Sequence, residues 1–270
     1  MNDEHTPSRG DMMHPFAGPV DEAPLSRAPL VKVVCQVRFP KPLSFGPATV
    51  EAARNLLAPK YPVAREQTGT VLVLGPDGVS QQQDAEKTWT MSDVHNNWRI
   101  VLAQNFVSIE TSLYNSRSDF MERVGDLLEA TQKSYAPPVY DRLGVRYVNR
   151  IEEVEDLDRL ELMVKPVALA GLGVPHEDVK VRHSLCDTLF VDGSANIQAR
   201  WGWLPAGAVI DADLSAPTVE HWMLDIDVFS SGGTQFDSGE LTSQAREFAE
   251  KSYRLFRWLV TDEFIENFGG

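Results

Sequence analysis

Two stretches of the chain share one order of residue types. Residues 108–120 (SIETSLYNSRSDF) and 224–236 (LDIDVFSSGGTQF) both run from an alternating acidic strand, through an aromatic residue and a polar turn, to a phenylalanine. Aligning Glu110 with Asp225 also aligns Tyr114 with Phe229, whereas Phe120 and Phe236 match only after a shift of one residue. Such self-similarity, at a period of about 120 residues, predicts duplication of one strand–helix–strands–helix unit.

Each predicted unit begins with a strand in which apolar and polar residues alternate. These strands are LVKVVCQVRF at 30–39 and RLGVRYVNRI at 142–151, and a period of two is typical of a half-buried strand. We expect further strands at 68–74, 86–93, 97–114 (a hairpin about Gln104-Asn105), 180–191, 194–204 and 221–229.

Helical patterns separate these strands. We expect a helix from Pro47 to about Pro59, a short helix around 157–163, and a long one over about 241–266. Another helix follows Asp119 and Glu122, which have the spacing of a capping box. Amphipathic helices cover one face of an antiparallel sheet.

The predicted fold class is therefore α+β. Two similar β-α-β-meander-α units would form one curved antiparallel sheet with helices packed on one face. In element order alone this resembles TATA-binding-protein-like folds or a pair of helix-grip units, an analogy that carries no function. We assign residues 1–27 to a disordered tail, 28–138 to the first repeat and 139–270 to the second, packed as one globular body.

Composition, cysteine content and net charge limit the classes of protein to which this chain can belong. Apolar residues make up 43% of the chain and charged residues 24%, as in ordinary globular proteins. No apolar run approaches the roughly 20 residues that cross a bilayer, and the N-terminus lacks the regions of a secretory signal. With only Cys35 and Cys186, we expect a cytoplasmic protein with free thiols. The net charge of −14 argues against a non-specific nucleic-acid binder.

Arginines recur at the polar positions of the predicted strands. They are Arg38, Arg142, Arg146 and Arg150, and Arg182 and Arg200 extend the set. One interpretation is a site for an anion or a nucleic acid. The other is cross-strand pairing with Glu110, Asp225 and Asp227, which is the commoner arrangement on a sheet face. These arginines and carboxylates are our candidate binding residues.

Other groups of residues are weaker candidates for a catalytic or metal-binding site. Asp225 and Asp227 share a strand face and could act as an acid–base pair, but arginine pairing is commoner, so we name no catalytic residue. His183 and Cys186 would point to opposite faces, so we expect no metal and no cofactor. Nucleophile, nucleotide and zinc-protease motifs are absent from the sequence.

Aromatic residues and the C-terminus complete the candidates. Trp201 and Trp203 share a strand face and could form a stacking platform or a partner surface, although core packing is the commoner role. We interpret the terminal Gly269-Gly270 as the end of a helix rather than as a conjugation tail.

The chain resembles a sporadically distributed bacterial family of uncharacterised proteins of about 250–270 residues. The resemblance runs from about residue 26 to the C-terminus and is carried by APLVKVVCQVRF, FVSIET with Tyr114, RLGVRYVNRI, LDIDVF and VTDEFIENFGG. It implies a bacterial cytosolic protein without an established activity. Sporadic distribution is associated with defence and toxin–antitoxin cargo.

Three classes of function stay open. The first, which we favour, is a non-catalytic adaptor, antitoxin-like, defence or chaperone-like protein that engages a protein partner through its open sheet face; it predicts an apolar or aromatic patch there. The second is an anion or nucleic-acid binder, which predicts a positive patch. The third is an enzyme, which predicts a pocket around the strand carboxylates with a raised pKa. The sequence does not specify an oligomeric state.

Overall fold

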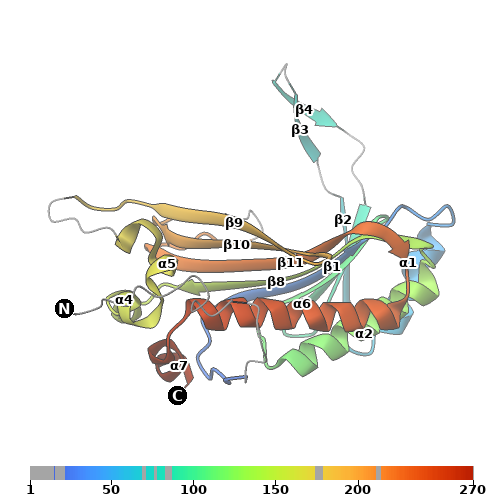
Figure 1. Ribbon diagram of the computed structural model, residues 1–270. Coiled ribbons are helices and arrows are strands. Elements are labelled where there is room, and N and C mark those ends of the chain that lie inside the picture. The colour runs from blue at the N-terminus through green and yellow to red at the C-terminus, as the bar shows by residue number, and fades with distance from the viewer. Residues whose placement is uncertain are drawn as a thin grey trace, which may run out of the picture.

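The computed structural model describes residue 15 and residues 22–68, 71–75, 78–82, 87–173, 179–210 and 214–269. Most of the predicted tail lies outside these residues. The fold is α+β, as expected, and is built on an open nine-stranded antiparallel sheet in the order β2-β5-β6-β7-β1-β8-β11-β10-β9 (Figure 1).

The first half of the chain supplies the strands from β2 to β1. Its elements are β1 (Leu30–Arg38), α1 (Pro47–Leu57), β2 (Val63–Thr68), β3 (Val71–Gly75), β4 (Gly78–Gln82), β5 (Lys87–Ser92), β6 (Trp98–Leu102), β7 (Phe106–Thr111) and α2 (Arg117–Ser134). The β3–β4 hairpin forms a separate two-stranded sheet that projects from the β2 end (Figure 1). The predicted hairpin about Gln104-Asn105 is confirmed as the β6–β7 turn.

The second half supplies the strands from β8 to β9. Its elements are β8 (Val139–Ile151), the short helices α3 (Val154–Leu157), α4 (Leu160–Met163) and α5 (Pro166–Leu169), a 3₁₀ turn (Ala170–Gly173), β9 (Ser184–Asp192), β10 (Ala195–Leu204), β11 (His221–Gln235), α6 (Ser238–Leu259) and α7 (Asp262–Gly269). Strands β1 and β8 pair antiparallel at the centre of the sheet and join the two halves.

Helix boundaries differ from the prediction at several points, and the short helix expected around 157–163 is divided into α3 and α4. Ser116, not Asp119, caps α2, because its hydroxyl accepts the Asp119 backbone N–H at 3.1 Å. The predicted single helix over 241–266 is wrong: α6 ends at Leu259, where Val260 turns extended and forms an isolated bridge with Val164. This bridge uses backbone groups that a continuous helix would need, so α7 begins anew.

Helices α2 and α6 lie along one face of the sheet (Figure 1). The alternation of β1 sends Val33, Cys35 and Val37 into the core beneath these helices, each at most 3% exposed. No helix covers the opposite face within the described part of the chain (Figure 1). We call it the open face. None of the helices described is long and apolar enough to cross a membrane.

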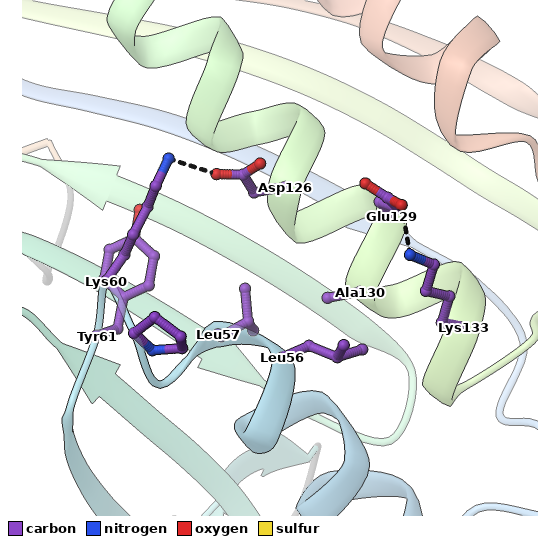
Figure 2. Close-up of a pocket in the computed structure, with 9 residues that line it drawn as sticks. Leu56, Leu57, Lys60, Tyr61, Asp126, Glu129, Ala130 and Lys133 are labelled. Carbon is purple, nitrogen blue, oxygen red and sulfur yellow. Dashed lines mark hydrogen bonds and ion pairs between the residues drawn. The ribbon is translucent and has the colours of Figure 1, made fainter.

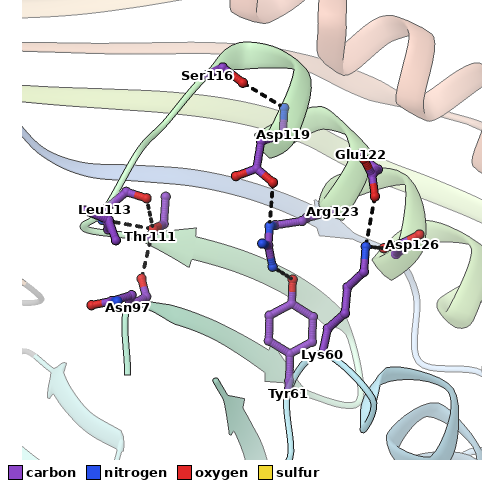
Figure 3. A network of polar contacts seen from close by, with 10 residues as sticks. All are labelled: Lys60, Tyr61, Asn97, Thr111, Leu113, Ser116, Asp119, Glu122, Arg123 and Asp126. Atoms are coloured by element: carbon purple, nitrogen blue, oxygen red, sulfur yellow. Dashed lines mark hydrogen bonds and ion pairs between the residues drawn. The ribbon is translucent and has the colours of Figure 1, made fainter. Parts of the chain in front are cut away.

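A polar network fastens α2 to the first half of the sheet (Figure 3). The Arg123 guanidinium donates to Asp119 at 3.0 Å and to the Tyr61 hydroxyl at 3.4 Å, and it stacks 4.2 Å from the centre of the Trp98 ring. The Lys60 ammonium donates to Asp126 at 2.7 Å, one turn further along the helix. These contacts join α2 to the loop between α1 and β2 and to Trp98 of β6.

Candidate binding site on the open sheet face

The open face carries a hollow of about 540 Å³ at the centre of the sheet. It spans six neighbouring strands and reaches the end of β2. Its lining is Lys32, Val34, Gln36, Arg38, Gln67, Thr88, Thr90, Arg99, Val101, Phe106, Ser108, Glu110, Arg142, Gly144, Arg146 and Asp227. We call this the basic hollow, because five of these side chains are cationic and two are carboxylates.

Arg142 lies flat across the floor of the basic hollow. Its guanidinium donates to Asp227 at 2.7 Å and stacks 4.5 Å from the centre of the Phe229 ring. A Cβ on Gly144 would stand only 2.5 Å from the Arg142 Nη1 atom, so the glycine makes room for this path. The hydrogen bond and the ring contact thus hold Arg142 against β11.

Arg146 and Arg200 converge on one buried carboxylate. Arg146 donates to both oxygens of Asp225, at 2.7 and 3.0 Å, and Arg200 donates to Oδ2 at 2.6 Å. The Asp225 side chain is 1% exposed. We call Arg146, Asp225 and Arg200 the second ion cluster.

Glu110 occupies a similar place in the first half of the sheet. Its carboxylate meets the Lys32 ammonium at 3.1 Å and Arg99 Nε at 2.6 Å, and its side chain is 17% exposed. We call Lys32, Glu110 and Arg99 the first ion cluster. All three of its members line the basic hollow.

Arg38 differs from the other arginines of the basic hollow. It is exposed at the end of β1, and its Nε donates to Gln36 Oε1 at 2.8 Å. Among the described residues no carboxylate forms an ion pair with it. Its charge is therefore available to a ligand.

Asp227 has a raised pKa. Burial raises its pKa from 3.8, and the charges of Arg142 and Arg146 oppose that rise without cancelling it. A raised pKa in a hollow is what the enzyme alternative requires. The ion pair with Arg142 nevertheless engages this carboxylate as a hydrogen-bond acceptor.

The remaining predicted residues lie elsewhere. Arg150 donates to the Ser215 carbonyl at 2.9 Å, outside the hollow, and Arg182 is exposed outside the strands. Trp201 is 3% exposed on the helix-covered side and donates to the Val167 carbonyl at 2.8 Å. Trp203 packs against the same core. The two tryptophans are therefore core residues and do not form a platform on the open face.

Sequence reasoning missed Lys32 and Arg99 as members of the site. Each occupies a polar position between buried neighbours, Lys32 beside Val33 and Arg99 between Trp98 and Ile100. The strand period that selected the other arginines would have found both.

No cluster of histidine, cysteine, aspartate or glutamate able to hold a metal occurs among the residues that the structure describes.

A smaller hollow of about 250 Å³ lies between the end of α1 and the C-terminal half of α2 (Figure 2). Leu56 and Leu57 form its floor, and ion pairs at its rim join Lys60 to Asp126 and Lys133 to Glu129 (Figure 2). These charged groups satisfy one another, so the basic hollow is the better candidate site.

Comparison with known proteins does not assign this chain to a family. Models of known protein families give no match to this chain. Curated proteins also give none.

Proposed function

We propose that the protein is a non-catalytic binding protein whose basic hollow takes an anion that carries phosphate or carboxylate groups. The observation that carries this proposal is the gathering of five cationic side chains around one hollow in a chain of net charge −14. Charge of the opposite sign to the rest of the surface concentrates its counter-ion locally.

The carboxylates of the open face would act as positioning groups. A guanidinium has five N–H donors, and a bidentate carboxylate uses two of them. Asp227 therefore holds Arg142 through one hydrogen bond, and further N–H donors of this guanidinium can face an anion. An anion that meets pre-oriented donors loses less affinity to side-chain ordering.

We also propose that the two halves arose by duplication. Each ion cluster has a carboxylate on the last strand of its half and cations on the two neighbouring strands. In both clusters, one cation is the direct cross-strand partner of the carboxylate. The other cation lies on the strand at the carboxylate's other side, two residues from the residue that pairs with the carboxylate. Glu110 and Asp225 are the residues that the sequence match aligned, and this independent agreement supports the proposal.

Titration calorimetry with inorganic pyrophosphate would test the anion site. We expect saturable binding that weakens with salt. Arg38→Gln should weaken it at least fivefold, because the arginine without a carboxylate partner is lost. The matched control is Arg246→Gln, which removes an exposed arginine from α6 on the other side of the sheet. Equal affinities for the two variants would refute the site.

A second candidate function is engagement of a protein partner at the β9 edge of the sheet. Leu185, Leu189 and Val191 project from this edge strand with 42%, 53% and 71% of their surface exposed. An exposed apolar edge strand is a template for strand addition. Leu189→Lys should abolish copurification of a stoichiometric partner, and retention of the partner would exclude this edge.

We likewise propose that the protein belongs to the bacterial family that it resembles and that it is cytoplasmic. The sequence segments that carry the resemblance support both proposals.

A further inference from the structure

A second cavity, of about 410 Å³, lies on the helix-covered side of the sheet, away from the basic hollow. Its walls come from the start of α2, from β8 and β11, and from α6, and its cover is the segment 22–28 before β1. The lining is Glu22, Ala23, Pro24, Leu25, Ala28, Leu30, Tyr114, Asn115, Ser116, Arg117, Tyr147, Asn149, Ile226, Ala249, Ser252, Tyr253 and Phe256. This volume lies within the range of small-molecule sites.

The interior of this cavity is mostly apolar, with a few hydroxyl groups. Tyr114 and Tyr147 pack edge to face with ring centres 5.8 Å apart, and their hydroxyls are hydrogen-bonded. Burial raises the pKa of both tyrosines, so both hydroxyls stay protonated. One O–H donates within the pair, and the other can donate to a ligand. Phe256 and Leu30 add apolar surface. The cavity therefore suits an apolar body with an acceptor group at one end.

One cation stands at the mouth of the cavity. The Arg117 side chain is 21% exposed, and its guanidinium stacks 5.3 Å from the centre of the Tyr253 ring. It pairs at 2.9 Å with Glu22, whose side chain is 57% exposed. A carboxylate of the covering segment thus already occupies the anion position of this cavity.

The covering segment is held unequally at its two ends. Near β1 it is anchored by backbone hydrogen bonds from Arg27 to Phe268 at 3.0 Å and from Arg150 to Pro29 at 2.7 Å. At its other end the contacts between described residues include the Glu22 ion pair and the Ala23 N–H, which donates to the Tyr253 hydroxyl at 2.7 Å, and Leu25 packs against the core. Release of these contacts would free this end of the segment while the backbone hydrogen bonds near β1 remain.

We propose that this cavity binds a small monocarboxylate with an apolar body, whose carboxylate replaces that of Glu22 on Arg117. The apolar body would lie between α6 on one side and two tyrosines on the other, Tyr147 of β8 and Tyr114 of the β7–α2 connection. Glu22 then acts as a competing internal carboxylate that keeps the empty cavity closed. The proposal is independent of the basic hollow.

Calorimetric titration of the full chain with octanoate and with octan-1-ol tests it. We expect one molecule of octanoate per chain, bound more tightly than the neutral alcohol. Glu22→Gln should tighten octanoate binding about tenfold, since it removes the competing carboxylate. The matched control is Glu66→Gln, another exposed glutamate in an ion pair, with Lys87 at 2.7 Å and outside this cavity; its affinity should be unchanged.

Arg117→Gln should erase the preference for octanoate over the alcohol. A preference that survives this change would overturn the assignment of Arg117. If this variant fails to fold, the Glu22 series still decides: absence of saturable octanoate binding to Glu22→Gln, or equal affinity in the Glu22 and Glu66 variants, would refute the cavity as a carboxylate site.

Discussion

The two ion clusters of the sheet have the same layout but different surroundings. In the second, Asp225 is 1% exposed and receives three hydrogen bonds from Arg146 and Arg200. In the first, Glu110 is 17% exposed and borders the basic hollow. The same arrangement of charged residues can therefore stabilise the fold in one half of the sheet and face a ligand in the other half.

Burial explains this difference. A carboxylate taken out of water requires full pairing, and removal of it leaves its arginines charged and unpaired. A carboxylate in contact with water loses little when a partner leaves, because solvent replaces the interaction. We therefore expect Asp225 of the second ion cluster to govern stability and Glu110 of the first to influence ligand binding.

The largest expected effect is on the second ion cluster. Asp225→Asn should lower the free energy of unfolding by about 3 kcal/mol, because the buried ion pairs of Asp225 with Arg146 and Arg200 are lost. Urea denaturation measures this loss.

The matched variant is Glu110→Gln in the first ion cluster. It should cost less than about 1 kcal/mol and should strengthen pyrophosphate binding, because a negative charge leaves the hollow. Equal losses of stability in the two variants would contradict the contrast between the clusters.

A smaller effect concerns Asp227, beside the second ion cluster. Its folded-state pKa is raised above 3.8 by burial, so the native protein binds a proton more readily than the unfolded chain. Wild-type stability should then rise, relative to Asp227→Asn, as the pH falls from neutral through the range just above 3.8. Denaturant midpoints at successive pH values measure this difference. The opposite slope would mean that the carboxylate stabilises the fold mainly through Arg142.

The smallest effect compares the two thiols, one in each half. Burial raises the pKa of Cys35 to about 12, whereas Cys186 is half-buried on the edge strand β9. Since the thiolate is the reactive form, a disulfide reagent at pH 8 should label Cys186 in the native protein and Cys35 only after unfolding. Cys186→Ser should leave the folded chain unlabelled, and fast labelling of that variant would show that β1 opens.

Much of the fold could be predicted from the sequence. Alternation with a period of two located the central strands, and it assigned Arg38, Arg142 and Arg146 to the face opposite the apolar residues. The period of helical patterns located α1 and α2. These signals are local, and each residue's neighbours along the chain are sufficient to generate them.

Three outcomes depended on contacts between distant segments. The break between α6 and α7 depends on a bridge to Val164, and the burial of Trp201 depends on α5, which accepts its indole N–H. The pairing of Arg146 with Asp225 depends on the register of β8 against β11.

The sequence by itself determined the α+β class, the central strands and the common face of the three arginines, because period and composition act along the chain. Only the tertiary structure decided which carboxylates pair with Arg142 and Arg146, that a hollow lies on this face, and that residues 22–28 cover a second cavity. The physical reason is that ion pairing and cavity formation depend on distances between segments far apart in sequence, which strand register and helix packing set.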